Sequence, residues 1–224
     1  MTTDLASKAT DGEFRVLRAG EEKELPGGRF YAPATISAIH ELKRDGVFVY
    51  RYQIIDAGGI GENIINEHNI LQREVHVGEV DYVFITHNHP DHVGNIARFK
   101  NAYIHMPDSH FHVRKPNEFG LMPEDFMSKP GNKMSASRNP RVKLISAPGH
   151  SGWDMSVLYT GKDARVLACG DLFWSEDDFR NDTSYLGLCV NKDMQERSRD
   201  YIRNQLKPDV IIPESDIEPD SDSY

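Results

Sequence analysis

Cysteines, long apolar runs and a secretion signal are scarce or missing in this sequence. Only two cysteines occur among 224 residues, Cys169 and Cys189, and neither belongs to a CxxC pair. A disulfide framework is therefore not expected, and both thiols are predicted to be reduced. No apolar run approaches the ~20 residues of a membrane-spanning helix, and the N-terminus lacks the charged-then-apolar pattern of a signal peptide. These absences argue against a secreted protein and a membrane partner, and they favour a cytoplasmic location, with the nucleus as the alternative.

Positive charge is also sparse. The net charge is −9, and residues 171–224 hold fourteen acidic against six basic residues. A long basic face of the kind that binds duplex nucleic acid is therefore excluded. The exception is segment 108–143, which holds seven basic and four acidic residues. We interpret this segment as a solvated loop, and the alternative is a flap that contacts an anionic substrate.

The remaining composition is that of a globular protein, with 38% hydrophobic and 27% charged residues. The length suffices for one hydrophobic core. Residues 1–12 are short, polar and without periodicity, and residues 217–224 form an acidic stretch, so both ends are predicted to be disordered. This leaves residues 13–216 as one domain.

The order of predicted elements indicates the fold class. Short runs rich in β-branched and aromatic residues predict strands, and two longer amphipathic runs and one short one predict helices. Asp193 is the expected cap of the last helix, and Pro208 follows its end. Two sheets packed face to face, with helices on their outer faces, accommodate this order. We therefore predict an α/β protein, an αββα sandwich of two mixed sheets. The predicted strands are 13–20, 34–42, 47–59, 80–86, 102–106, 142–148, 155–160, 165–171 and 209–213, and the predicted helices are 62–73, 91–99 and 193–207.

The stretch THNHPDH at 86–92 places three histidines and one aspartate directly after a predicted buried strand. Imidazole and carboxylate together are a ligand set that suits zinc, or less often iron or manganese. The alternative is a set of solvated or core histidines, which is the better interpretation for a single histidine but not for three at this spacing. The stretch therefore predicts a metal site formed by His87, His89, Asp91 and His92.

Two further candidates lie at the ends of later strands. His150 falls in a Pro-Gly turn between two predicted strands, and Asp171 ends an apolar one. Taken alone, the first could be a turn residue and the second a helix cap. Together with the histidine-rich stretch, metal ligation explains both, because a buried aspartate is costly unless it is paired or bound to a metal.

The HxHxDH stretch, the PGH turn and the GD pair at these separations resemble the metallo-β-lactamase superfamily, over residues 14–213. The resemblance implies a first metal on His87, His89 and His150, a second on Asp91 and His92, and Asp171 as a bridge. It also implies that an activated hydroxide attacks the substrate and that Asp91 accepts or directs the proton of the attacking water. Asp56, in the stretch IIDAGG, is implied to hold the metal loop in place.

The sequence departs from this family at one ligand position. The family has a histidine in a Pro-Gly-His-Gly turn after the last strand, whereas this turn reads Pro213, Glu214, Ser215, Asp216, and no histidine follows His150. Three outcomes stay open: Glu214 or Asp216 substitutes as a carboxylate ligand, one metal is bound instead of two, or the site binds metal without turnover. We favour an interpretation of both acids as part of a solvated tail. The expected cofactor is Zn²⁺, one or two ions, with Mn²⁺ or Fe²⁺ open at the second position.

The predicted function is a metal-dependent hydrolase. The stretch 194–213 and the compact layout resemble superfamily members that cleave RNA, which implies an endoribonuclease acting on RNA of the histone pre-mRNA type. The first alternative is an ester or thioester hydrolase with glyoxalase-like chemistry. The second is a non-catalytic metal-binding regulatory protein. The expected partners are an RNA or small-molecule substrate, and a homodimer is expected by analogy with compact relatives.

Overall fold

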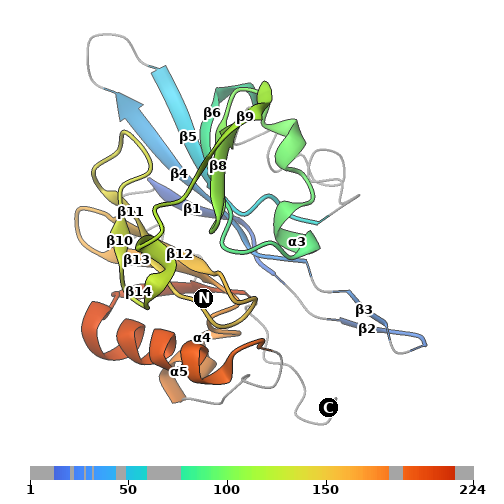
Figure 1. Ribbon diagram of the computed structural model, residues 1–224, viewed down its shortest axis with the longest axis vertical. Coiled ribbons are helices and arrows are strands. Elements are labelled where there is room, and N and C mark those ends of the chain that lie inside the picture. The colour runs from blue at the N-terminus through green and yellow to red at the C-terminus, as the bar shows by residue number, and fades with distance from the viewer. Residues whose placement is uncertain are drawn as a thin grey trace.

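The structure, a computed structural model, describes residues 13–20, 23–27, 29–31, 33–43, 49–59, 77–181 and 189–214. The predicted helix at 62–73 and the predicted disordered ends lie outside these residues, as do Ser215 and Asp216. Figure 1 shows two sheets one above the other, with helices α4 and α5 below the lower sheet and α3 beside the upper one.

The first sheet has seven strands in the order β1-β4-β5-β6-β7-β8-β9. Strands β5, β6 and β7 run parallel to one another, and the other neighbours are antiparallel. A separate two-stranded ribbon joins β2 (Lys23–Leu25) and β3 (Arg29–Tyr31). The sheet consists of β1 (Phe14–Arg18), β4 (Ile36–Lys43), β5 (Val49–Ile55), β6 (Val80–Phe84), β7 (Tyr103–His105), β8 (Ser109–His112) and β9 (Lys115–Leu121).

The second sheet has five strands in the order β10-β11-β12-β13-β14. Only β13 and β14 are parallel, so both sheets are mixed. The predicted αββα sandwich is thereby confirmed. The strands are β10 (Lys133–Met134), β11 (Val142–Ser146), β12 (Met155–Thr160), β13 (Arg165–Gly170) and β14 (Val210–Pro213).

Buried side chains alternate between the two faces of each sheet, because successive residues of a strand point to opposite sides. In β5, Ile55 joins the core between the sheets while Ile54 joins the core on the outer face. In β12, Val157 points inward and Leu158 outward. Both faces are thus covered, which explains why the strand sequences are short apolar runs without polar alternation.

Helices cover both outer faces. On the first sheet lie α3 (Pro90–Val93) and the 3₁₀ turn η2 (Ile96–Arg98), which replace the single helix predicted at 91–99. On the second lie α4 (Glu176–Asn181), α5 (Lys192–Asp200) and the π-helical turns of η5 (Tyr201–Leu206). Two short 3₁₀ turns, η1 (Val77–Glu79) and η3 (Phe126–Ser128), complete the described elements. None of the helices among the described residues combines the length and apolar character needed to cross a membrane.

Two local predictions were wrong. The N-cap of α5 is Asn191, not Asp193, because Asn191 has the extended backbone of a cap and its side chain accepts a hydrogen bond from the Met194 amide at 3.1 Å. The segment 108–143 is not a plain solvated loop, since it forms β8, β9, η3 and β10. Its basic residues are therefore displayed on ordered structure.

Candidate metal centre

The histidine-rich stretch follows β6 and is held in place by Asp56. The Asp56 backbone has a positive φ of 59°, which turns the chain sharply after β5. Its carboxylate accepts hydrogen bonds from the Thr86 amide at 2.8 Å and from the Thr86 hydroxyl at 3.0 Å. The same carboxylate lies 3.0 Å from His92 Nδ1. A carboxylate on one ring nitrogen fixes the tautomer, so the other nitrogen of His92, Nε2, is left for a metal.

The turn that carries His150 is held by Asp154. The Asp154 carboxylate accepts hydrogen bonds from the backbone amides of Gly149 at 2.8 Å and Ser151 at 2.9 Å, and from the Ser151 hydroxyl at 2.6 Å. Gly149 has a φ of 143° and lies against α5, where an added Cβ would fall 2.3 Å from the backbone of Gln195. Only glycine fits this position, so the turn is pressed against the helix.

The turn that carries Asp171 follows β13 and lies under a buried ion pair. Gly170 has a φ of 54° and packs on Thr86, where a Cβ would come within 2.6 Å of the hydroxyl. The Arg199 guanidinium donates to the Leu172 carbonyl at 3.0 Å and to the Asp178 carboxylate at 3.0 Å. Both charged groups of this pair are almost completely buried. The ion pair therefore ties the Asp171 turn to α4 and α5.

Glu214 lies at the end of β14, beside Asp171, and only 5% of its surface is exposed. The Thr35 hydroxyl donates to the Glu214 carbonyl at 2.6 Å and accepts from the Gly20 amide at 2.8 Å. A Cβ on Gly20 would fall 1.9 Å from the same carbonyl oxygen, so this close approach requires glycine. The interpretation of Glu214 as part of a solvated tail was wrong, because its backbone is clamped and its side chain is buried.

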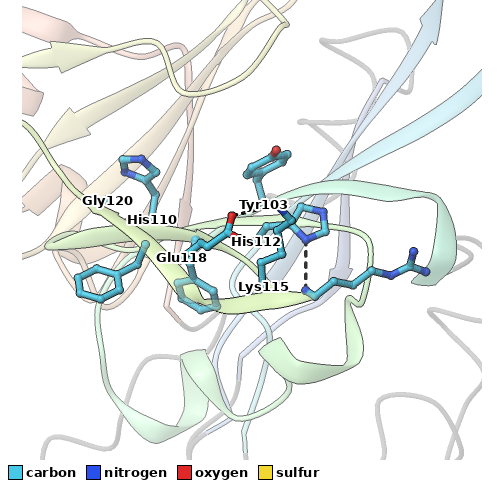
Figure 2. A pocket seen from close by; sticks show the side chains of 9 residues that line it. Tyr103, His110, His112, Lys115, Glu118 and Gly120 are labelled. Carbon is cyan, nitrogen blue, oxygen red and sulfur yellow. Dashed lines mark hydrogen bonds and ion pairs between the residues drawn. The ribbon is translucent and has the colours of Figure 1, made fainter.

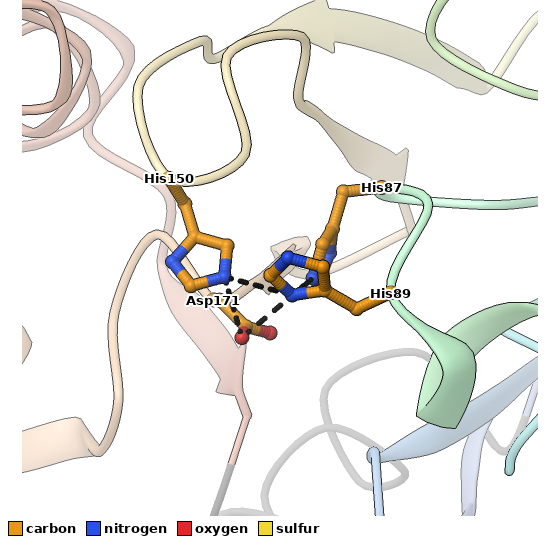
Figure 3. Close-up of side chains that lie close together, drawn as sticks. All are labelled: His87, His89, His150 and Asp171. Carbon is orange, nitrogen blue, oxygen red and sulfur yellow. Dashed lines mark hydrogen bonds and ion pairs between the residues drawn. The ribbon is translucent and has the colours of Figure 1, made fainter. Parts of the chain in front are cut away.

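One set of donor atoms, the histidine-rich group, consists of His87, His89, His150 and Asp171, which lie within 4.8 Å of one another (Figure 3). His89 Nδ1 lies 2.8 Å from His87 Nε2 and 3.1 Å from His150 Nε2. Asp171 Oδ2 lies 3.1 Å from His150 Nε2 and 3.7 Å from His87 Nε2. Ligands bound about 2.0–2.1 Å from a tetrahedral zinc lie about 3.3 Å from each other. The spacing of the group therefore suits one such ion.

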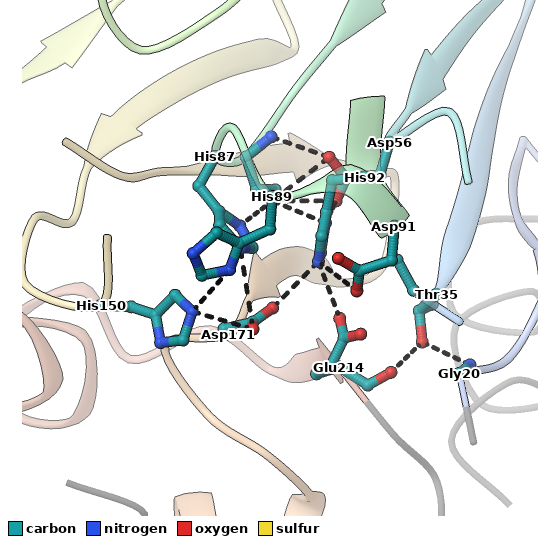
Figure 4. Close-up of polar contacts among 12 residues, drawn as sticks. Gly20, Thr35, Asp56, His87, His89, Asp91, His92, His150, Asp171 and Glu214 are labelled. Atoms are coloured by element: carbon teal, nitrogen blue, oxygen red, sulfur yellow. Dashed lines mark hydrogen bonds and ion pairs between the residues drawn. The ribbon is translucent and has the colours of Figure 1, made fainter. Parts of the chain in front are cut away.

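A second set, the carboxylate-rich group, consists of Asp91, His92 and Glu214, also within 4.8 Å of one another. His92 Nε2 lies 3.4 Å from Asp91 Oδ2 and 3.6 Å from Glu214 Oε2. The other oxygen of Asp171, Oδ1, lies 3.1 Å from His92 Nε2. Asp171 thus turns one oxygen toward each group, as Figure 4 shows.

Two buried atoms at the junction of the groups indicate that the residues fit a metal. His92 Nε2 and Asp171 Oδ1 are buried, and neither has a hydrogen-bond partner among the residues that the structure describes, although the two atoms lie only 3.1 Å apart. Buried polar atoms without a partner are costly. Donor atoms that converge on one point without bonding to each other are what a bound cation requires. The geometry therefore suits a divalent metal at each group.

A family model described as the metallo-beta-lactamase superfamily matches residues 51–215, well over half of the chain. The chain belongs to the metallo-beta-lactamase superfamily. It is 28% identical over 199 residues to metallo-beta-lactamase domain-containing protein 1 of Xenopus laevis, covering 88% of this chain and 77% of that protein. It is 29% identical over 93 residues to a hydroxyacylglutathione hydrolase of Pectobacterium atrosepticum, covering 42% of this chain and 33% of that protein. The crystal structure of a quorum-quenching N-acyl homoserine lactone lactonase superposes with a TM-score of 0.60 at 17% identity, over 93% of each chain. The similarity predicted from the sequence motifs is thereby confirmed.

Members of the metallo-beta-lactamase superfamily are metal-dependent hydrolases, and the cluster of His and Asp residues in this chain agrees with that class. Metal sites in the superfamily hold divalent ions, typically zinc. Nitrogen ligands dominate the histidine-rich group, which suits zinc. Oxygen ligands dominate the carboxylate-rich group, which suits harder cations as well.

The imidazoles of the site differ in the direction of their pKa shifts. Burial lowers the pKa of His87 well below its usual value and also lowers that of His89, with Asp171 opposing the shift. Burial also disfavours the charged form of His92, but the surrounding carboxylates, led by Asp56, outweigh it and raise its pKa. For His150, burial is likewise outweighed, here by the Asp171 carboxylate, and the pKa is raised. Neutral imidazole is the form that binds a metal, so His87 and His89 are ready ligands.

Burial favours the neutral form of both central carboxylates, but the net shifts of their pKa values have opposite directions. Burial opposes ionisation of Asp171, but the neighbouring imidazoles of His87 and His92 outweigh it and hold the pKa of Asp171 well below its usual value. Burial raises the pKa of Glu214 well above its usual value, and the negative charge of Asp171 adds to the rise. A divalent cation between them would stabilise the ionised form of Glu214.

The structure brings together all six residues that the sequence motifs single out as ligands, with Asp56 beside them and Glu214 as a seventh donor. Asp216 lies outside the described residues. Sequence reasoning missed Asp154, whose position four residues after His150 is the only signal that could have indicated it. It also missed the contacts of Gly20 and Thr35, because Thr35 and Glu214 are 179 positions apart in the sequence.

Proposed function

We propose that this chain is a two-metal hydrolase that cleaves phosphodiester bonds in single-stranded RNA. The observation that carries the hydrolase assignment is the position of Asp171, with one oxygen toward each of two complete donor groups. We assign His87, His89 and His150 to one metal and Asp91, His92 and Glu214 to the other.

The residues of the chain have separate tasks in this reaction. Divalent ions at the two groups would lower the pKa of a water molecule and neutralise negative charge on the substrate. Asp91 has the most exposed carboxylate of the two groups, at 29%, which leaves it open to the substrate side. In this position it can accept the proton of the attacking water or direct it. Asp56 and Asp154 position His92 and the His150 turn without contacting the substrate.

Support for RNA comes from the uneven distribution of charge along the chain. The ordered segment 108–143 carries three more basic than acidic residues, whereas residues 171–224 are strongly acidic. A phosphodiester backbone is attracted to the first and repelled by the second. A local basic path is enough for a nuclease that acts on single strands. An RNA substrate also agrees with the predicted cytoplasmic or nuclear location, and the predicted homodimer stays a prediction.

The second candidate is a thioester hydrolase. It is favoured by the similarity to a hydroxyacylglutathione hydrolase over 93 residues. The same ligands can activate water for attack on a thioester carbonyl. The remaining alternative, a non-catalytic metal-binding protein, depended on the loss of the last histidine, and the buried position of Glu214 removes much of its basis.

The test measures metal content and hydrolysis together on protein purified without added metal. We expect two divalent ions per chain and cleavage of a fluorescein-labelled single-stranded RNA in the presence of Zn²⁺ or Mn²⁺. S-acyl glutathione and bis(4-nitrophenyl) phosphate serve as thioester and small diester substrates. Turnover of the thioester alone would select the second candidate, and two bound metals without turnover of any substrate would select the non-catalytic protein.

Ser215→His restores a histidine at the family's ligand position and tests whether Glu214 already completes the second group. The control is Glu196→Gln, at an exposed acidic position of α5. If Glu214 completes the second group, added histidine changes neither the metal content nor the rate by more than about twofold. A rise from one to two metals in this variant would mean that Glu214 is not a ligand.

A further inference from the structure

A hollow of about 570 Å³ opens on β7, β8 and β9, apart from the two donor groups. Aromatic and charged side chains line it together, among them Tyr103, His112 and Phe119 (Figure 2). Its volume falls in the range of ligand sites, about 300–1,000 Å³, and exceeds what a single ion needs. The function of the metal centre does not account for this hollow.

The rings of the hollow are exposed, although large aromatic side chains usually avoid water. Tyr103 is 50% exposed and Phe119 is 67% exposed. Tyr103 is the register partner of His112, and their rings meet edge to face with centroids 4.7 Å apart. Exposed flat rings of this kind offer faces on which the bases of a single strand stack.

The end of the hollow that lies toward the metal centre is formed by His110 over Gly120. A Cβ on Gly120 would fall 2.5 Å from His110 Nε2, so the ring lies directly against the backbone of this glycine. His110 stacks on His105 with centroids 5.7 Å apart. His105 is the partner of Phe84, the last residue of β6, from which the chain runs on to His87. Strand β8 lies two strands from β6, about 10 Å across the sheet. The His110 end of the hollow therefore lies on the side of the sheet from which the chain runs on to the metal centre.

The charges of the hollow match a nucleotide. Arg114 and Lys115 lie at the end opposite His110 and present cations to a phosphate. The Glu118 carboxylate lies 2.9 Å from Lys115 Nζ, and both side chains are well exposed, so this ion pair is weak and can open. Glu118 can then accept a hydrogen bond from an N–H on the edge of a base. The Arg114 amide donates to His112 Nδ1 at 3.2 Å, which leaves the neutral ring with its proton on Nε2 as a donor.

We infer that this hollow is a substrate subsite that stacks one unpaired base of single-stranded RNA and binds the adjoining phosphate through Arg114 and Lys115. The inference deepens the proposed function and rests on it for the claim that the bound strand is the substrate. Duplex RNA does not expose base faces and fits the hollow poorly.

The experiment uses the metal-loaded protein and two pocket variants, Phe119→Ala for stacking and Arg114→Ala for the phosphate contact. Leu121→Ala is the matched control for the first, an exposed residue on the same strand that does not line the hollow. Arg180→Ala, on α4, is the control for the second. Binding of a 2′-O-methyl single-stranded ten-mer is followed by fluorescence anisotropy, and kcat/KM is measured for RNA and for bis(4-nitrophenyl) phosphate.

We expect each pocket variant to weaken RNA binding about tenfold, and Arg114→Ala to lower the salt dependence of binding as one phosphate contact is lost. Turnover of the small diester should stay unchanged, as should RNA binding by both controls. Both pocket residues are exposed, so folding, checked by thermal melting, should be unaffected.

Three results would overturn either the RNA subsite or the proposed hydrolase function. Pocket variants that bind RNA as tightly as the controls overturn the subsite, while RNA cleavage would still support the proposed function. Equal binding of duplex and single-stranded RNA also overturns it. Binding through the hollow without cleavage of RNA or the small diester upholds the subsite as an RNA site and overturns the hydrolase.

Discussion

The two donor groups share one edge of the sandwich but differ in chemistry. The histidine-rich group has three imidazoles and one carboxylate, whereas the carboxylate-rich group has one imidazole and two carboxylates of its own. Imidazole ligands suit zinc, and oxygen ligands also accept harder ions such as Mn²⁺. The difference teaches that the two halves of one centre can present different donor atoms, and under the proposed assignment of Glu214 as a ligand we expect them to differ in metal preference.

The groups also differ in how the chain holds them. Two members of the histidine-rich group, His150 and Asp171, come from turns that glycines and Asp154 fix locally. Glu214 instead depends on Thr35 and Gly20, which clamp its carbonyl from the opposite end of the sequence. The carboxylate-rich group is therefore the half that is more sensitive to changes far away in sequence.

The largest expected effect comes from removing the centre of the histidine-rich group with His89→Ala. The Nδ1 atom of His89 contacts both other imidazoles of the group, so its loss removes a ligand that cannot be replaced locally. A catalytic metal lowers the activation barrier by several kcal/mol. We therefore expect its loss to reduce kcat/KM for RNA on the order of 1,000-fold. Elemental analysis should show the loss of one metal.

The control for this variant is His40→Ala, a histidine on β4 stacked on Tyr52. It should retain both metals and wild-type turnover. If His89→Ala keeps two metals and its activity, the histidine-rich group is not the catalytic half.

Most of the fold and six of the seven donors were predictable from the sequence, because strand ends are local features. The apolar run 80–86 and the stretch after it already placed the histidines at a strand end, and β13 did the same for Asp171. The family resemblance then supplied the grouping of these residues. The register of β13 with β14 is what brings Glu214 beside Asp171, and register across distant strands leaves no local pattern.

The failures share this cause. Glu214 has the same sequence signature as the acids that follow it, and the clamp of its carbonyl by Thr35 leaves no trace in that signature. Segment 108–143, which we interpreted as a solvated loop, forms β8 and the edge strand β9, and a strand at the edge of a sheet needs few buried residues. In both cases tertiary contacts outweighed local composition.

The second prediction concerns Glu214, the residue that makes the carboxylate-rich group different from the histidine-rich group. Glu214→Gln keeps the size of the side chain but removes the charge, so the carboxylate-rich group should lose its metal and kcat/KM should fall about 100-fold, with the histidine-rich group still filled. Glu214→His should instead restore two metals and shift the preference toward Zn²⁺ over Mn²⁺. Both are measured by titrating chelator-treated protein with each metal.

Glu196→Gln serves again as the exposed control and should behave as wild type. Equal metal preference in Glu214→His and in the wild-type protein would mean that residue 214 does not set the chemistry of this half. That result would remove the basis for calling the two groups chemically different.

The smallest expected effect is a weakening of metal binding when the positioning residues are changed. Asp56 positions the carboxylate-rich group, and Asp154 positions the histidine-rich group. In Asp56→Asn one oxygen becomes an NH₂ group, so either the Thr86 amide or His92 Nδ1 loses its acceptor. If His92 then carries its proton on Nε2, that atom can no longer bind a metal, and we expect about tenfold weaker binding at the carboxylate-rich group alone. Asp154→Asn removes an acceptor from the His150 turn and should weaken the histidine-rich group alone by a similar factor. Calorimetric titration with Zn²⁺ resolves the two binding steps, and each variant should weaken a different one. A shift of the same step in both would show that the groups fill as one coupled site joined through Asp171.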